Sequence, residues 1–424
     1  MTDAGIGGLL ESLLGERAVS TEEYAKRLAD FDVGALLDAA LDHATPAELT
    51  TTCEESYTHA NGFEKVSFPP VPGRAERLRL HLWRRAPLQA DPHNHRWALT
   101  SRVLAGALRS TTFEAGATGT VHRHYRHRPH TPPPGCTFDE LGSATLQLAS
   151  VIDHLAGQTY ALPPETVHVA GPAPGRIDPT VTLALELAPV TQDTDVYTPA
   201  GAAKPVGTRV MPPCYTPDEV RARLGEVRQL VAVSAFREVM RRAYTAPTFR
   251  HHRWYVPYHL ELVERLAAEL LDHYPGADRA KVSALVWLHD YGKALHNSPS
   301  HQVTLSEGAL RLREAGLDEP FVADVVAYAR MLDRAPELDL SRAPVEVRIA
   351  SSADGCAHLV GPFFHLYWWE NPDRPHDQLM AENLRKLDKD WHRKIVLPEA
   401  RAAFEGRHRM LREQAGELPE RFLT

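Results

Sequence analysis

The sequence changes its pattern at a proline-rich stretch, PAGAAKPVGTRVMPPCY, which spans residues 199–215. Before this stretch, from about residue 76, short runs of alternating apolar and polar residues are separated by Pro, Gly and Asp. After it, apolar residues recur at helical spacing. A period of two is typical of strands, and a period of 3.6 is typical of helices. The pattern therefore predicts a multidomain α+β chain, with an antiparallel β region followed by an all-α region.

The same patterns predict the domain bounds. Residues 1–75 form an N-terminal helical segment, 76–198 a β domain, 199–216 a linker and 217–424 an all-α domain. A chain of 424 residues is too long for one ordinary core, which agrees with this division. The N-terminal helices can pack on the β domain or mediate a homodimer, and the sequence leaves both open. The later helices are expected at about 217–243, 255–273, 277–296, 300–315, 319–332, 343–366 and 376–416.

Composition excludes several kinds of partner. The net charge of −8 does not favour nucleic acid or an anionic membrane. No apolar run reaches the roughly 20 residues that span a bilayer, and no basic segment precedes the first apolar residues. The four cysteines lie far apart without a CxxC pair, which suits a reducing cytoplasm. We therefore expect a cytoplasmic protein that binds neither nucleic acid nor membranes.

Two histidines one residue apart begin the first candidate site, in DPHNHRWALT at residues 91–100. Residues i and i+2 of a strand point to the same face, so His93 and His95 can reach one metal ion. His168, in GQTYALPPETVHVAG, would add a third imidazole. Imidazole suits iron, copper, nickel or zinc, and a three-ligand face leaves positions open for catalysis.

Residues 76–198 resemble the cupin family. The residues that match its two motifs are His93, His95 and Gly106 for the first, and Gly157, Pro163 and His168 for the second. The resemblance implies a small antiparallel β-barrel that holds one metal ion in its mouth. Leu99 replaces the glutamate of the first motif, which leaves the three histidines as the protein ligands.

Three histidines without a carboxylate are similar to the thiol dioxygenases among the cupins. The resemblance then implies mononuclear iron(II), O2 and a small, thiol-like or amino-acid-like substrate. The alternative is a binding or sensing module that regulates the other domain. Arg79, His81 and Arg96 can hold a substrate carboxylate, although ordinary surface charge explains them more simply. The stretch VHRHYRHRPH, at 121–130, predicts a polar hairpin or a loop at the mouth, with metal binding as a lesser alternative.

The second candidate site lies in ALVWLHDYGKAL, at 284–295, where His289 and Asp290 end an apolar helix. Neighbouring helical residues point about 100° apart, so this pair can bind one metal only from a helix end or turn. His259, in VPYHLELVERLAAELL, and Asp354, in RIASSADGCAHLVG, would close the site from other helices. Lys293 either meets phosphate charge or is an ordinary lysine at a helix end.

The order His, His-Asp, Asp over 217–424 resembles the HD superfamily of metal-dependent phosphohydrolases. The resemblance implies a divalent metal (iron, manganese or another) that activates water against a phosphate ester. Asp290, Lys293 and Arg330 are then the candidate catalytic groups.

A minority of that superfamily activates O2 with two irons and two further histidines. His301, in SPSHQVTLSEGAL, matches the first of these, but the helix FVADVVAYARMLD has no histidine, and Arg330 stands where the second is expected. Hydrolysis is therefore favoured. An oxygenase that acts in sequence with the first site is the alternative.

Overall fold

The computed structural model describes residues 5–85, 90–130, 135–296, 301–333, 338–418 and 421. The chain packs into two units, one of Met1–Pro174 and Pro179–Val231 and the other of Gly175–Asp178 and Ala232–Thr424. The division falls inside helix α5 (Pro217–Thr245), and not in the stretch 199–216 that the sequence predicts as a linker. Residues of the first half of α5, such as Leu224, belong to the core of unit 1, and residues of the second half, such as Phe236, belong to that of unit 2.

Four short helices begin unit 1: α1 (Ile6–Leu14), α2 (Thr21–Asp30), α3 (Val33–Asp42) and α4 (Pro46–Glu55). Ser20 caps α2 by accepting a hydrogen bond from the Glu23 amide, and Thr45 and Glu48 form a capping box on α4. Their apolar side chains share one core with the leucines of β3 and β9. The helical segment therefore packs on a sheet of its own unit.

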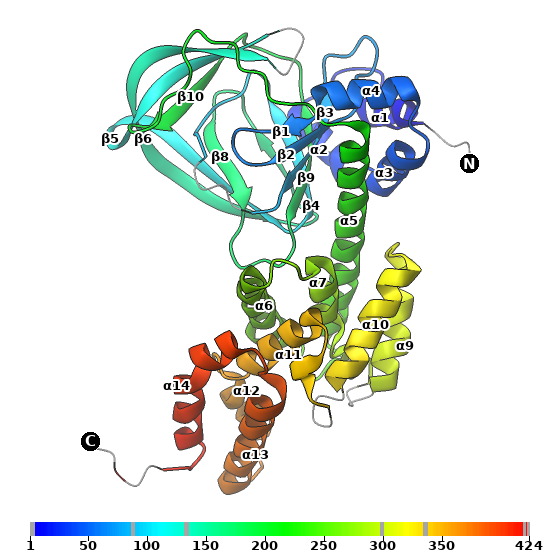
Figure 1. Cartoon of the computed structure of the whole chain (residues 1–424), viewed down its shortest axis with the longest axis vertical. Coiled ribbons are helices and arrows are strands. Elements are labelled where there is room, and N and C mark those ends of the chain that lie inside the picture. Colours follow the sequence, from blue (N-terminus) through cyan, green and yellow to red (C-terminus); the bar gives the residue numbers. More distant parts are fainter. Residues whose placement is uncertain are drawn as a thin grey trace. The chain divides into compact units, whose positions relative to one another are not determined.

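The strands of unit 1 form two antiparallel sheets (Figure 1). The six-stranded sheet has the order β1-β2-β3-β9-β4-β7, and the four-stranded sheet has the order β10-β5-β6, with β8 also paired to β5. The strands are β1 (Tyr57–Thr58), β2 (Glu64–Ser67), β3 (Arg77–Trp83), β4 (Leu99–Ala105), β5 (Ala107–Pro129), β6 (Cys136–Leu155), β7 (Thr159–Leu162), β8 (Val167–Pro172), β9 (Thr180–Glu186) and β10 (Thr194–Pro199). The β-rich first region is confirmed, and closure into one barrel stays a prediction.

The long strands β5 and β6 pair along almost their whole length, and Figure 1 shows them side by side. Residues 121–129 of the histidine-rich stretch are the far part of β5, paired with β6 along this length and with β10 over 122–127. The stretch is thus an arm of a hairpin, as one of the two predictions had it, and not a loop.

The proline-rich stretch 199–216 is held against unit 1. Val210 exchanges backbone hydrogen bonds with Cys136 at 2.8 and 3.0 Å, and the Gly207 amide donates to Phe138 at 3.0 Å. The Tyr215 amide donates to Ser56 at 2.9 Å. Proline removes donors from this stretch, yet the remaining amides use the free edge of β6, so the stretch is not a free linker.

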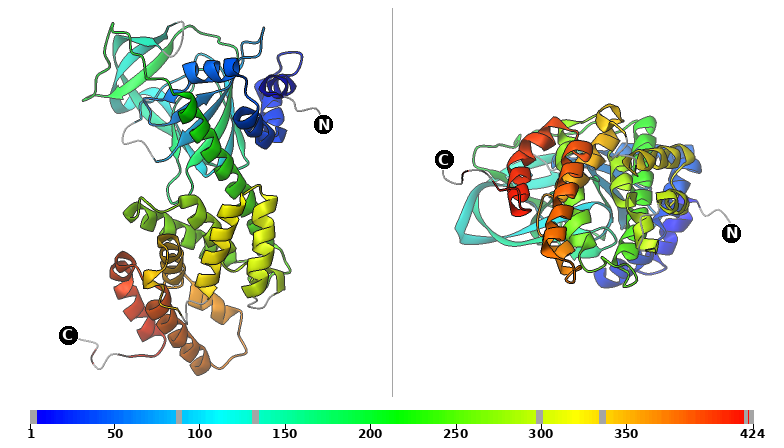
Figure 2. Two further views of the ribbon diagram at one scale, coloured as in Figure 1. Left: turned by 45° about the vertical axis from the view of Figure 1, so that its right-hand side comes forward. Right: turned by 90° about the horizontal axis from the view of Figure 1, so that it is seen from below.

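Unit 2 is helical, which confirms the second predicted region. Its elements after α5 are a π-helix (Val256–Leu260), α6 (Glu261–His273), α7 (Arg279–Leu288), α8 (Tyr291–His296), α9 (His301–Glu314), α10 (Glu319–Asp333), a 3₁₀ turn (Leu340–Arg342), α11 (Val345–Ala357), α12 (Phe363–Trp369), α13 (His376–Lys389), a second π-helix (Asp390–Lys394) and α14 (Pro398–Gln414). Helices α9 and α10 pack against each other and lie side by side in Figure 1 and in the left view of Figure 2. Among the residues described, no helix is long and apolar enough to cross a bilayer.

Candidate metal centres

The first centre joins the irregular segment before β4 to strand β8. The His93 amide donates to the His168 carbonyl at 3.1 Å, and the His168 amide returns a bond to His93 at 2.9 Å. The His95 amide donates to the Pro164 carbonyl at 3.0 Å. The sequence predicts that His93 and His95 lie on a strand, whereas in the structure His93 forms two isolated β-bridges, with His168 on β8 and with Val196 on β10.

The three imidazoles form a nearly regular triangle. Ring centroids are 5.1 Å apart for His93 and His95, and 4.9 Å apart from each of these to His168. One nitrogen of each ring lies within 4.8 Å of the others. The structure thus brings together the three histidines that the sequence predicts.

Backbone carbonyls orient two of the rings. Nδ1 of His93 lies 2.9 Å from the Asp91 carbonyl, and Nδ1 of His168 lies 3.4 Å from the Thr166 carbonyl. An Nδ1–H that donates to a carbonyl leaves Nε2 unprotonated, as a metal ligand requires. Burial also lowers the pKa of all three histidines, that of His168 to about 3. Neutral imidazoles in this arrangement fit a divalent metal.

The position of the missing glutamate is apolar. Leu99 is buried with Leu162 and Ala184. Among the described residues, only this centre and a second one in unit 2 bring the ligand atoms of three metal-ligating side chains within 4.8 Å of one another.

Gly106, the motif glycine, has φ +67°, and a Cβ there would lie 2.7 Å from the Pro179 carbonyl oxygen. Its role is therefore in the turn between β4 and β5.

The three residues considered for a substrate carboxylate do not form one group: Arg79 and His81 share a face of the sheet, and Arg96 lies elsewhere. Arg79 pairs with Glu55 at 2.7 Å and with Glu186 at 3.3 Å, so its charge is already compensated. The Arg96 guanidinium lies over the Trp97 ring at 4.8 Å. His81 lies on a face of the six-stranded sheet with Arg79, since the two are i and i+2 on β3.

The second centre is formed by three helical elements of unit 2. His259 lies on the first π-helix, His289 follows the last residue of α7, and Asp354 lies on α11. Their ligand atoms lie within 4.8 Å of one another. A π-helix commonly marks a functional site, because its extra residue turns a side chain out of the regular helical row.

Asp354 is the focus of this centre. Its Oδ1 lies 3.5 Å from Nε2 of His259 and 3.9 Å from Nε2 of His289. Oδ1 of Asp354 and Nε2 of His289 are buried without a hydrogen-bond partner among the described residues. Ligands about 2.1 Å from one tetrahedral ion lie about 3.4 Å apart, so the spacing and the unpaired atoms fit a divalent metal.

Asp290 lies beside this cluster but is bonded elsewhere. Its Oδ2 accepts hydrogen bonds from Lys293 at 2.6 Å and from the Tyr255 hydroxyl at 3.0 Å, and lies 3.7 Å from Nε2 of His289. Burial alone would raise the pKa of Asp290, but Lys293 and His289 lower it well below its usual range. Lys293 thus compensates the charge of Asp290. The sequence predicted instead either a phosphate contact or an ordinary lysine at a helix end.

Three side chains at this centre were not predicted from the sequence. Nε2 of His358 lies 3.6 Å from Asp354 Oδ1, and its Nδ1 lies 2.9 Å from Oδ2 of the fully buried Asp390. Lys394, from the second π-helix, forms an ion pair with Asp354. The i,i+4 spacing of Asp354 and His358 is a signal that could have found the histidine. Asp390 and Lys394 arrive by tertiary packing.

The residues considered for a second ion are only partly brought together. Nδ1 of His301 lies 2.7 Å from Oδ1 of Asp333, the last residue of α10. Arg330 is exposed on the same helix, and no described contact joins it to the centre. Burial raises the pKa of Asp333, and the neighbouring Asp290 acts in the same direction. The group that α10 contributes beside His301 is therefore Asp333 and not Arg330.

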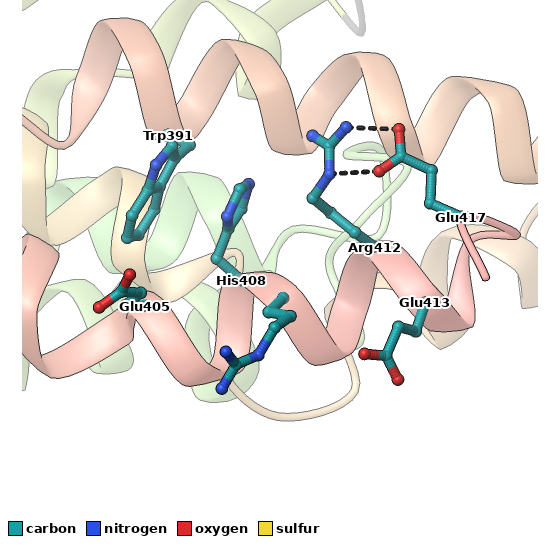
Figure 3. Close-up of a pocket in the computed structure, with 7 residues that line it drawn as sticks. Trp391, Glu405, His408, Arg412, Glu413 and Glu417 are labelled. Atoms are coloured by element: carbon teal, nitrogen blue, oxygen red, sulfur yellow. Dashed lines mark hydrogen bonds and ion pairs between the residues drawn. The ribbon is translucent and has the colours of Figure 1, made fainter. Parts of the chain in front are cut away.

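A pocket on the last helices of unit 2 lies apart from both sets of predicted residues. Figure 3 shows its lining, in which the rings of Trp391 and His408 stack at 4.3 Å and Arg412 pairs with Glu417. None of its lining residues is a predicted site residue.

Comparison with known proteins adds only weak structural likeness. No family model matches the sequence, and no curated protein matches it significantly. Among solved structures, the chain is similar to a hydroquinone 1,2-dioxygenase, PnpCD, described in complex with Cd2+ and 4-hydroxybenzonitrile. The match has 13% sequence identity and a TM-score of 0.18, and covers 42% of this chain and 80% of that one. At these values we draw no conclusion from it, and the chemistry rests on the two centres themselves.

Proposed function

We propose that the chain is a metalloenzyme with two sites. In the first, a cupin-type site, His93, His95 and His168 hold mononuclear iron(II), and a small molecule is oxidised with O2. In the second, an HD-type site, His259, His289 and Asp354 hold a divalent metal with Asp290 beside them, and a phosphate ester is hydrolysed.

The triangle of three neutral imidazoles is the observation that supports the first activity. Three nitrogen ligands without a carboxylate leave several coordination positions for substrate and O2. Iron(II) held there would activate O2, while the substrate would supply the electrons that reduce it. The chain fixes the rings through the carbonyls of Asp91 and Thr166. Leu99, which stands at the position of the motif's glutamate, forms a buried apolar cluster with Leu162 and Ala184.

The surroundings of Asp354 support the second activity. A divalent metal supplies Lewis acidity and an activated water at such a centre. Lys293 and Lys394 bring two ammonium groups to the carboxylates of Asp290 and Asp354. A metal bound to Asp354 would take over part of this compensation, and the ammonium groups would then meet the charge of a phosphate ester.

A second candidate function rests on the contact between His301 and Asp333. These two side chains, with Asp290 nearby, are of the types that bind a second iron. The second site would then be an oxygenase acting in sequence with the first.

Two paired assays distinguish these functions in the iron-loaded full chain. We expect O2 uptake with small thiols or amino acids to be lost in His93→Ala and kept in His289→Ala. We expect phosphate release from p-nitrophenyl phosphate to show the opposite pattern. O2 uptake that is lost in His289→Ala and kept in His93→Ala would assign oxygenation to the second site. Small-molecule binding at the first site without any turnover would make that site a sensing module.

A further inference from the structure

Four side chains on three adjacent strands of unit 1 present polar groups to one face of the six-stranded sheet. Lys65 on β2 is directly opposite His81 on β3, and His81 is directly opposite Thr182 on β9. Trp83 is two residues beyond His81 and points to the same face. Directly opposite residues have Cβ atoms about 5 Å apart, so these side chains form one contiguous group.

At Trp83 this face is turned towards strand β8, and the opposite face of β3 carries the core shared with the N-terminal helices. Leu80 and Leu82, on the other face of β3, belong to the core shared with those helices. Trp83 packs instead with Leu108 and Ala170. Ala170 is two residues beyond His168 on β8, so His168 also points to this side.

A series of ring contacts connects the face to the first metal centre. The His93 and His59 centroids are 6.4 Å apart, and the His59 ring stacks on Phe63 at 4.4 Å. Phe63 in turn lies 4.8 Å from His81 and 5.0 Å from Trp83. A series of packed rings therefore runs from the polar group to the metal ligand His93.

The donors of this group are unused. The Thr182 hydroxyl and the Trp83 indole nitrogen belong to residues that are 0% and 3% exposed, and neither has a hydrogen-bond partner in the described parts of the chain. Lys65 lies 4.6 Å above the Tyr57 ring and forms no ion pair with a described carboxylate. Buried donors without partners are costly, and a ligand that accepts hydrogen bonds here would offset that cost.

The charges nearby favour an anionic ligand. Arg79 is neutralised by Glu55 and Glu186, and Lys204 is neutralised by Asp91 at 2.5 Å. Lys65 is thus a cation whose charge a ligand can meet. Burial, with contributions from Lys65 and Arg79, lowers the pKa of His81 to about 3, so its ring is neutral and can donate one N–H.

We propose that Lys65, His81, Trp83 and Thr182 form a subsite for a carboxylate, so that the first centre takes a small carboxylic acid whose other end faces the three histidines. The inference rests on the proposed function of that centre and narrows its substrate class. Lys65 supplies the charge, and the other three supply directional hydrogen bonds.

The test measures binding, not turnover, in the full chain loaded with iron under anaerobic conditions. Benzoate and butyrate are titrated beside their primary amides, which keep the shape and lose the charge. We expect both acids to bind about 10- to 100-fold more tightly than their amides. Lys65→Met should remove this preference and Lys65→Arg should keep it, while Lys26→Met, an exposed lysine on α2, should change nothing. Thr182→Val, which keeps the shape of the side chain, should weaken the acids several-fold.

Equal binding of acids and amides, no binding of either acid to the iron-loaded chain, or an unchanged preference in Lys65→Met would each overturn the subsite. The iron content of the same samples separates this result from the proposed function. Acid binding that persists in a chain unable to retain iron would leave the subsite standing and refute the oxygenase.

Discussion

Replacing Arg237 with methionine removes the cation from a buried ion network in unit 2. Arg237 contacts Asp178 through one nitrogen and Glu264 at 2.6 Å through the other. Both carboxylate side chains are almost fully buried, at 2% and 0% exposure. Ser283, on α7, adds a hydrogen bond to Asp178 at 3.1 Å. The network thus joins α5, α6 and α7, and the last two adjoin the histidines of the second centre.

Arg237→Met should lower the free energy of unfolding by about 3 kcal/mol, the low end of the range for removing one partner of a buried ion pair. Glu264 keeps Arg176 at 3.4 Å, so Asp178 is the carboxylate left unpaired. Burial already raises the pKa of Asp178, so protonation limits the cost. For a unit of this size, such a loss lowers Tm by about 6–12 °C.

Arg241→Met is the matched control, one turn further along α5. Arg241 and Arg237 lie over the same Trp287 ring, at 5.1 and 5.0 Å. Arg241 pairs with Glu261 at 3.3 Å. Unlike the buried carboxylates that Arg237 contacts, Glu261 is 36% exposed, as is Arg241 itself. An exposed pair contributes about 0–1 kcal/mol. Urea unfolding followed by tryptophan fluorescence measures both variants, and equal losses would refute the assignment of the energy to burial.

Three further predictions concern both units. Burial lowers the pKa of His81 and His168 from 6.5 to about 3. Between these values protons bind the two histidines in the unfolded chain but not in the folded one, which lowers the free energy of unfolding. In urea unfolding of the metal-free chain, the free energy of unfolding should fall by about 1.4 kcal/mol per histidine at pH 5.5 and by almost nothing at pH 7.5. A free energy of unfolding that does not change with pH would contradict this. Gly106→Ala should lower the free energy of unfolding by more than about 2 kcal/mol, because the new Cβ meets a backbone oxygen. Gly157→Ala, at φ +88° with open space around it, should lower it by about 1 kcal/mol. His358→Ala should weaken metal binding at the second centre about 10- to 100-fold in a chelator competition, and unchanged affinity would remove it from that centre.

Local patterns were sufficient to predict most of the elements. The helix expected at 319–332 is found at Glu319–Asp333, because its apolar spacing is regular and its ends are polar. The helix expected at 376–416 is interrupted by a π-helix and by residues 395–397. Pro398 explains the restart, since proline disfavours a helical residue before it and is tolerated at the first helical position.

Close spacing predicted one pair in each candidate site, and the resemblance to two families predicted the distant residues His168, His259 and Asp354. His93 and His95 lie two residues apart, and His289 and Asp290 are adjacent, so a few local bonds fix each pair. Asp390 and Asp333 could not be found in this way. Each reaches its centre from a helix that packs against it, and nothing in the local sequence shows which of many surface carboxylates will be buried there.

The metal content of the purified full chain tests the central claim most directly. It is measured by elemental analysis on the wild type, on His93→Ala and on His289→Ala, each purified without added metal. We predict iron that His93→Ala loses and a separate metal that His289→Ala loses, while each variant keeps the metal of the other site. If His93→Ala retains the full metal content of the wild type, the three histidines of the first centre hold no metal, and the proposed oxygenase is contradicted.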